Sequence, residues 1–247
     1  MIVIIPSRYD SVRLPGKPLI DINGKPLIEH VYNCAQDSNA ERIIVATDDE
    51  RISSAVKDFG GEAVMTSNQH QSGTDRINEV IDVLSIKDDE IIINLQGDEP
   101  LMPAALISQV ASLLENNPDY PMATACHRIT EQEEFKNPNL VKVVFDENDC
   151  ALYFSRAPIP WQAANQKSTP ATLGYGHIGI YGYRAGFIKQ YSQWPVVGIE
   201  KSEKLEQLRA LYHDIKIKVC VVDKLPGPGV DTPEDLAVVK KVLASYK

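Results

Sequence analysis

Short apolar runs alternate with amphipathic helical patterns through the first half of the chain, and this alternation constrains the fold most strongly. Continuous apolar runs at 2–5, 43–46 and 91–95 are typical of strands buried on both faces. Apolar side chains recur at helical spacing over 27–35, 52–59, 77–84 and 106–114. Alternating strands and helices favour right-handed crossovers, so we predict an α/β fold with a mostly parallel sheet flanked by helices.

The pattern changes after Asn117, where prolines interrupt the chain. The apolar runs 141–145 and 151–154 predict two paired strands around a polar turn, and 161–175 is expected to be a loop. Later elements are a strand over 177–183, a helix over 205–211, a strand over 217–222 and a final helix capped by Thr232. We therefore expect one domain over 1–247, with a core of about 1–117 and 215–247 and a lobe of about 118–214.

Composition excludes several classes of protein. The 247-residue chain has a formal net charge of −9, whereas broad nucleic-acid binding requires a basic surface. Any anionic substrate must instead meet a local cluster of cations. The four cysteines are far apart and form no C-x-x-C pair, which favours a reducing compartment. No signal peptide or membrane-spanning run is evident, so we expect a cytoplasmic enzyme without membrane or nucleic-acid partners.

A basic loop follows the first predicted strand, at the sheet edge where open α/β folds bind ligands. Its cations are Arg8, Arg13 and Lys17, while Gly16 and the small Ser11 would let backbone N–H groups approach phosphate oxygens. The loop matches neither the P-loop nor G-x-G-x-x-G. A solvated basic loop without a ligand is the alternative interpretation.

Two aspartates are candidate magnesium ligands. Asp98 follows the strand at 91–95 within Gln96-Gly-Asp-Glu-Pro, although Gly-Asp is also an ordinary turn. The segment after Asp231 is a good helix start, because Thr232 caps it and acids follow in the first turn. Helix capping leaves Asp231 unexplained. We therefore predict that Asp98 and Asp231 meet over Mg²⁺.

Further candidates each have a structural alternative. The loop at 70–76 could bind a phosphate or a base at a helix N-terminus, or could only cap that helix. Glu206 could form an exposed pair with Arg209, Tyr181 could belong to the core, and a lone histidine such as His177 is more often structural. The full set of such candidates is Arg156, His177, Tyr181, Glu206 and Gln207.

Several of these stretches occur together and in order in a known family. They are Pro-Ser-Arg-Tyr-Asp-Ser-Val-Arg-Leu-Pro-Gly-Lys-Pro-Leu, His-Gln-Ser-Gly-Thr-Asp-Arg, Gln-Gly-Asp-Glu-Pro, Ala-Leu-Tyr-Phe-Ser-Arg-Ala-Pro-Ile-Pro-Trp, His-Ile-Gly-Ile-Tyr-Gly-Tyr-Arg, Leu-Glu-Gln-Leu-Arg and Gly-Val-Asp-Thr-Pro-Glu-Asp-Leu. The chain resembles the CMP-Kdo synthetases, also called 3-deoxy-manno-octulosonate cytidylyltransferases. The likeness runs from Ile2 to beyond Leu236.

The resemblance implies a Rossmann-like nucleotidyltransferase fold whose lobe covers the sugar and helps to form a homodimer. The reaction would be CTP plus Kdo giving CMP-Kdo and pyrophosphate, for lipopolysaccharide synthesis. The resemblance implies catalytic roles for Lys17, Asp98 and Asp231, the two aspartates holding Mg²⁺. Nucleotide contacts would come from Arg8, Ser11, Arg13, Lys17, Ser72 and Arg76. Sugar contacts would come from Gln96, Arg156, His177, Tyr181, Glu206 and Gln207, with Arg156 facing the sugar carboxylate.

The sequence departs from the family pattern in the lobe, and other functions stay open. A basic residue usually precedes the His-Ile-Gly stretch, whereas this chain has Gly176, and the segment between Trp161 and His177 is short. Another acidic sugar, such as 8-amino-Kdo or a sialic acid, is therefore an alternative substrate. A dinucleotide-dependent oxidoreductase is disfavoured by the missing G-x-G-x-x-G. A non-catalytic nucleotide sensor on the same fold is the third alternative.

Overall fold

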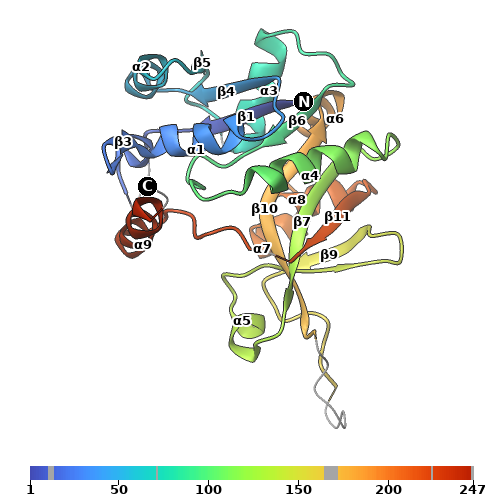
Figure 1. Ribbon diagram of the computed structural model, residues 1–247. Coiled ribbons are helices and arrows are strands. Elements are labelled where there is room, and N and C mark those ends of the chain that lie inside the picture. Colours follow the sequence, from blue (N-terminus) through green and yellow to red (C-terminus); the bar gives the residue numbers. More distant parts are fainter. Residues whose placement is uncertain (11–13, 71, 164–171, 224, 246–247) are drawn as a thin grey trace.

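The computed structural model describes residues 1–10, 14–70, 72–163, 172–223 and 225–245. A single large sheet runs through the described chain in the order β11-β7-β10-β6-β1-β4-β5, with β8 and β9 attached beside β10 (Figure 1). Its strands are β1 (Ile2–Ser7), β4 (Arg42–Thr47), β5 (Glu62–Met65), β6 (Ile91–Asn94), β7 (Met122–Ile129), β8 (Lys142–Phe145), β9 (Ala151–Ser155), β10 (Gly174–Arg184) and β11 (Ile217–Val222). A separate small hairpin pairs β2 (Asp21–Ile22) with β3 (Lys25–Pro26).

The N-terminal half of the sheet is parallel, as the alternating pattern predicts. β1 pairs in parallel with β4 and β6, and β4 pairs in parallel with β5. Side chains of β1 alternate between two buried clusters, Val3 and Ile5 on one face and Ile2 and Ile4 on the other. Burial on both faces explains why this strand is a continuous β-branched run in the sequence.

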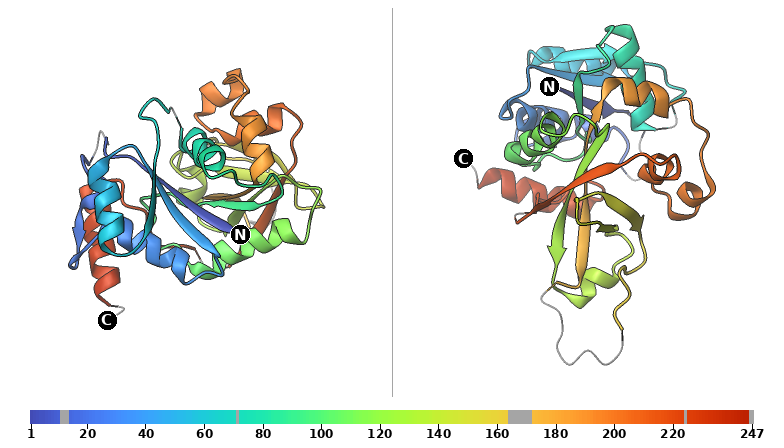
Figure 2. Two further views of the ribbon diagram at one scale, coloured as in Figure 1. Left: turned by 90° about the horizontal axis from the view of Figure 1, so that it is seen from above. Right: turned by 90° about the vertical axis from the view of Figure 1, so that its right-hand side faces the viewer.

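Helices cover both faces of the sheet. One face is packed by α1 (Leu27–Gln36), α2 (Glu50–Asp58), α4 (Ala104–Glu115) and α9 (Pro233–Ala244), and the other by α3 (Gly73–Val83), α6 (Ala185–Tyr191) and α8 (Gln207–Tyr212). The short helices α5 (Gln132–Lys136) and α7 (Gly198–Glu203) lie in the lobe, and a 3₁₀ turn, η1, spans Lys17–Leu19. Figure 2 shows α9 beside the N-terminal half of the molecule, so both ends of the chain contribute to the core.

The long strand β10 joins the core to the lobe. It pairs antiparallel with β6 at Tyr181–Arg184, with β7 on its other side, and with β8 at Tyr175 and Gly176. Tyr181 lies opposite Asn94, the last residue of β6, so the earlier part of β10 extends past the carboxyl edge of the parallel strands. The lobe is therefore a continuation of the sheet beyond that edge (Figures 1 and 2).

Most predicted elements are confirmed. The prediction included neither the hairpin β2–β3 and the turn η1 before Asn117 nor the helices α5, α6 and α7 after it. The paired strands β8 and β9, the strand β11 and the Thr232-capped helix α9 occur where expected. The prediction assigned no element to Met122–Ile129, which forms strand β7 between β11 and β10, and it began β10 three residues late. Of the predicted loop 161–175, the last two residues belong to β10, and 164–171 lie outside the described residues. Among the described residues, no helix has both the length and the apolar character needed to cross a membrane.

Candidate active site

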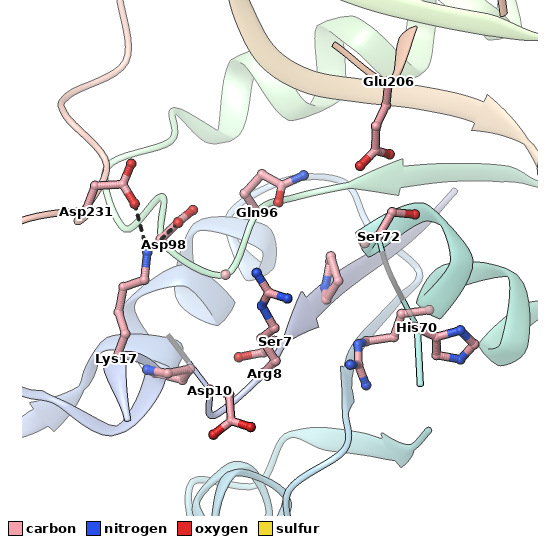
Figure 3. Close-up of a pocket in the computed structure, with 15 residues that line it drawn as sticks. Ser7, Arg8, Asp10, Lys17, His70, Ser72, Gln96, Asp98, Glu206 and Asp231 are labelled. Carbon is pink, nitrogen blue, oxygen red and sulfur yellow. Dashed lines mark hydrogen bonds and ion pairs between the residues drawn. The ribbon is translucent and has the colours of Figure 1, made fainter. Parts of the chain in front are cut away.

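A cavity of about 450 Å³ opens at the carboxyl edge of β1 and β6. Five segments meet there: the loop after β1, the start of α3, the turn after β6, the residue before α8 and the turn before α9 (Figure 3). Its lining residues are Pro6, Ser7, Arg8, Asp10, Lys17, Pro18, His70, Ser72, Gly73, Arg76, Gln96, Gly97, Asp98, Glu206 and Asp231. Strand ends of a parallel sheet commonly bind ligands at such a crevice.

Asp98 and Asp231 converge on one nitrogen, although they are far apart in the sequence. The Lys17 ammonium donates to Asp98 Oδ2 at 2.7 Å and to Asp231 Oδ1 at 3.1 Å (Figure 3). The backbone brings the two together, because Val230 N–H donates to the Asp98 carbonyl at 2.8 Å. The predicted meeting of the two aspartates is thus present, with a lysine ammonium between them.

Two glycines shape this corner. Gly16, just before η1, has φ +67°, a left-handed conformation that favours glycine, and a Cβ there would lie 3.0 Å from the Tyr9 ring. A Cβ at Gly97 would lie 3.0 Å from the Pro6 carbonyl oxygen, so glycine lets the turn after β6 pack against the end of β1. These close approaches place Lys17 and Asp98 on the same wall of the cavity.

The carboxylates of Asp98 and Asp231 change the pKa of neighbouring groups. Burial lowers the pKa of Lys17, but attraction to Asp98 and Asp231 outweighs it, so the pKa is raised and the ammonium stays charged. Burial, together with the charges of Asp98 and Asp231, raises the pKa of the adjacent Glu99 to about 7. A cation is therefore strongly favoured at this point.

The donor chemistry of Asp98 and Asp231 fits Mg²⁺, which is commonly held by one or two carboxylates together with substrate phosphates and water. Within the described ranges, no cluster of three or more histidine, cysteine or acidic residues has the arrangement of a metal site. The pair resembles a site completed by a phosphate-bearing ligand rather than a closed protein cage.

The start of α3 forms the opposite wall. Ser72 caps the helix, accepting a hydrogen bond from Asp75 N–H at 3.1 Å, and still lines the cavity. Arg76 also lines the cavity but is 4% exposed, and its guanidinium is paired with Asp48 at 2.7 Å and bonded to the Thr66 hydroxyl. Arg76 therefore links α3 to the end of β4 and is not a free cation for a ligand.

A second cavity of about 220 Å³ adjoins the first and shares Gly73, Gln96 and Glu206 with it. Its other lining residues are Thr74, Asn94, Met122, Tyr181, Tyr183, Tyr191, Lys204, Leu205 and Gln207. Glu206 accepts a hydrogen bond from Thr74 at 3.2 Å, and burial raises the pKa of its carboxyl despite that bond. Three tyrosine rings beside amide and carboxyl groups suit a polyhydroxylated ligand, because each polar group can bond a hydroxyl.

Two predicted sugar contacts lie outside both cavities. Arg156 Nε donates to the Glu203 carbonyl at 2.8 Å and Nη1 to the Pro138 carbonyl at 3.1 Å, so backbone acceptors hold its guanidinium within the lobe. His177 contacts the Thr124 hydroxyl through Nε2 at 2.9 Å and packs against the Tyr181 ring. Burial lowers the pKa of His177 to about 3, so its imidazole is neutral where it packs against Tyr181.

The remaining predicted residues divide by placement. Lining the cavities are Arg8, Lys17, Ser72, Gln96, Asp98, Tyr181, Glu206, Gln207 and Asp231. Ser11 and Arg13 lie outside the described residues. His70 belongs to the candidate loop at 70–76, whereas the predicted site residues did not include Asp10, Asn94, Tyr183, Tyr191 or Lys204. Of these, Asn94 had a usable signal, since it is a polar residue ending a run of buried isoleucines.

Comparison with known proteins agrees with a nucleotide-transferring site at a sheet edge. The cytidylyltransferase family model matches residues 2–217, and this chain belongs to that family.

Among curated relatives, the 3-deoxy-manno-octulosonate cytidylyltransferase of Hahella chejuensis is 54% identical over 247 residues, covering 98% of this chain and 97% of the relative. The corresponding protein of Vibrio cholerae is 53% identical over 245 residues, with coverage of 98% and 97%. A solved structure of CMP:2-keto-3-deoxy-manno-octonic acid synthetase complexed with CTP superposes with a TM-score of 0.92 at 44% identity, covering 100% of this chain and 99% of the other.

Proposed function

We propose that this chain transfers CMP from CTP to the anomeric hydroxyl of Kdo, giving CMP-Kdo and pyrophosphate for lipopolysaccharide synthesis. The observation that carries the proposal is the pair of joined cavities, one beside Lys17, Asp98 and Asp231 and the other lined by tyrosines and amides. A solved relative with CTP and curated relatives named for Kdo support the assignment of nucleotide and sugar.

The chemistry joins two anions. The anomeric oxygen forms a bond to the α-phosphorus, the bond from that phosphorus to the β-phosphate oxygen breaks, and the hydroxyl proton is released. Two like charges about 5 Å apart at an effective dielectric near 20 repel by about 3 kcal/mol. Arg8 and Lys17 supply positive charge at the larger cavity, which offsets that repulsion.

We propose Mg²⁺ as the cofactor, held by Asp98 and Asp231. When bound, such an ion can neutralise phosphate charge and lower the pKa of a coordinated hydroxyl. The chain's own groups orient the reactants. Gln96 lies in both cavities and donates from Nε2 to Asn94 Oδ1 at 3.2 Å, which fixes its amide between the nucleotide and sugar sides.

The proposed setting is the cytoplasm, with a homodimer as the assembled form. All four cysteines are free thiols, which agrees with a reducing compartment. Two large apolar side chains of the lobe, Leu152 at 61% and Trp161 at 85%, are exposed, and a partner subunit would bury such groups.

The test measures pyrophosphate release with CTP, UTP, ATP or GTP against Kdo, 8-amino-Kdo and N-acetylneuraminate, with and without Mg²⁺. We expect release only with CTP, Kdo and Mg²⁺ together. Preferential release with another sugar acid would reassign the substrate. No release with any pair would favour a nucleotide sensor, and release without any divalent ion would remove the metal from the proposal.

A further inference from the structure

Strand β10 is irregular where it passes from the lobe to the core. Its pairing with β7 shifts register between Ile178 and Tyr181. His177 lies before that shift, and its ring packs against the Tyr181 ring at 5.3 Å between centroids. In a regular strand, residues four positions apart are separated by about 13 Å. The irregular stretch therefore brings His177 next to Tyr181, which lines the smaller cavity.

The hydroxyl of Thr124 fills this irregular stretch. Thr124 belongs to β7, lies opposite Tyr181 in the pairing with β10 and is fully buried. Its oxygen is 2.7 Å from the Ile180 carbonyl oxygen and 3.3 Å from the Ile178 carbonyl oxygen. The same oxygen is also 2.9 Å from Nε2 of His177. One side-chain hydroxyl thus links the backbone carbonyls of the irregular stretch to the imidazole.

The number of protons in this cluster fixes the tautomer of His177. A threonine hydroxyl has one proton to donate, and a backbone carbonyl can only accept. The contact with the Ile180 carbonyl uses that proton, because two oxygen atoms at 2.7 Å need a proton between them. Thr124 Oγ1 must then accept from His177, so the proton of the neutral imidazole is on Nε2 and Nδ1 is an acceptor. Burial lowers the pKa of His177 to about 3, which keeps a second proton off the ring at neutral pH.

Nδ1 of His177 is accessible to a ligand. The residue is half-buried, and its ring makes a T-shaped contact with Phe154 at 5.1 Å between centroids. Among the described residues, Nδ1 of His177 has no hydrogen-bond partner, but it is not one of the fully buried atoms that lack a partner, as Nδ1 of His127 is. An accessible ring nitrogen without a proton can accept a hydrogen bond from a hydroxyl.

We infer that Thr124 is a positioning residue of the sugar site: it fixes His177 as the Nε2–H tautomer and so presents Nδ1 as an acceptor for a sugar hydroxyl beside Tyr181. This role rests on the proposed function, because the sugar is the ligand that supplies the hydroxyl. Thr124 lines neither cavity and acts through His177. The opposite tautomer would present a donor at Nδ1, so a hydroxyl that donates there would lose its partner.

Long-range ¹H–¹⁵N NMR spectra of the protein labelled at its five histidines test the tautomer directly, because protonated and unprotonated ring nitrogens resonate far apart. The His177→Phe variant assigns the His177 signals. We expect the Nε2–H tautomer in the wild type and in Thr124→Ser, which keeps the hydroxyl. Thr124→Val removes the hydroxyl, so both tautomers should become populated. A spectrum with the proton on Nδ1 in the wild type would overturn the assignment.

Steady-state assays that vary Kdo and CTP separately measure the effect on the sugar. Thr124→Val should raise KM for Kdo about threefold to tenfold, the loss expected for one hydrogen bond between neutral groups, with KM for CTP within about twofold. Thr124→Val leaves a buried carbonyl without its donor, and Thr124→Ser loses a buried methyl group, so both variants should unfold at a lower temperature than the wild type. Only Thr124→Val should weaken sugar binding, which separates a positioning role from a loss of stability.

A double-variant cycle tests whether Thr124 acts through His177. In the His177→Phe background, Thr124→Val should cause no further rise in KM for Kdo. Ser38→Ala is the matched control and should leave KM unchanged, because the buried Ser38 hydroxyl also donates to a backbone carbonyl, that of Ala35 at 2.6 Å, but lines neither cavity. An unchanged KM for Kdo in Thr124→Val, or an equal rise in the His177→Phe background, overturns the role of Thr124. An inactive wild type would instead refute the proposed function, while the NMR spectra would still test the tautomer.

Discussion

Lys17 occupies the position between the two aspartates that a divalent ion would need, so replacing it should change metal binding. Lys17→Met removes the ammonium and keeps most of the apolar stem. In the wild type the ammonium is within 3.1 Å of both Asp98 and Asp231, and a metal held by the same carboxylates must displace it. The variant should therefore bind Mg²⁺ more tightly than the wild type in the absence of nucleotide.

The size of the expected change in Mg²⁺ affinity follows from how exposed the three charged side chains are. The Lys17 side chain is 14% exposed, and those of Asp98 and Asp231 are 33% and 48% exposed. Solvent screening at that exposure limits each ion pair to about 1 kcal/mol. Loss of two pairs corresponds to a free energy of about 2 kcal/mol, or a tightening of Mg²⁺ binding by about 30-fold. Without metal, the variant should lose stability by a similar or smaller amount.

Isothermal titration with Mg²⁺ measures the affinity, and thermal unfolding with and without Mg²⁺ measures the stability. Lys189→Met is the matched control, because Lys189 pairs with Asp88 at 2.7 Å on the surface, away from the cavities. The control should leave Mg²⁺ affinity unchanged. Equal Mg²⁺ affinity in Lys17→Met and the wild type would refute the competition between ammonium and metal.

Three further predictions concern the same region and the lobe. Asp98→Asn and Asp231→Asn should each lower kcat by orders of magnitude with little change in thermal unfolding, and near-normal turnover at saturating Mg²⁺ would contradict a metal role. Because the pKa of Glu99 is raised to about 7 in the folded protein, the folded state binds a proton that the unfolded state has already lost above pH 4.5. The free energy of unfolding without metal should therefore fall by up to about 3 kcal/mol between pH 4.5 and 7. Glu99→Gln should remove that decline in urea titrations at several pH values. Gly176→Ala would put a Cβ 2.2 Å from His127 Cε1 and should cost about 1–3 kcal/mol of unfolding free energy, which His127→Ala should largely restore in the double variant; additive losses would argue against the clash.

Sequence patterns predict the parallel half of the fold well because residue preference, helix capping and burial in the sheet favour the same structure there. β1 and β6 are unbroken apolar runs since both faces are buried, and α3 begins behind its cap Ser72. β7 escaped prediction because its side chains are mixed and partly small, with no clear period. Its strand conformation depends on β10 and β11 on either side, which are more than 40 residues away.

The site was predictable where a residue stands at a strand end or is left unexplained by capping. Asp98 and Asp231 belong to these classes, and the structure brings them together. Arg156 illustrates the opposite case, because Glu203, 47 residues later, holds it in place through contacts that sequence spacing does not indicate.

The shared strand β10 also affects how this protein can be altered by recombination. Residues near Gly176 pair within the lobe, whereas Tyr181–Arg184 pair with β6, and a register shift separates the two stretches between Ile178 and Tyr181. A chimaera that exchanges the lobe with that of a relative must therefore join within one hydrogen-bonded strand. Crossover points placed at the register shift would preserve both ladders, whereas a loop-to-loop exchange would carry away a strand that the parent core requires.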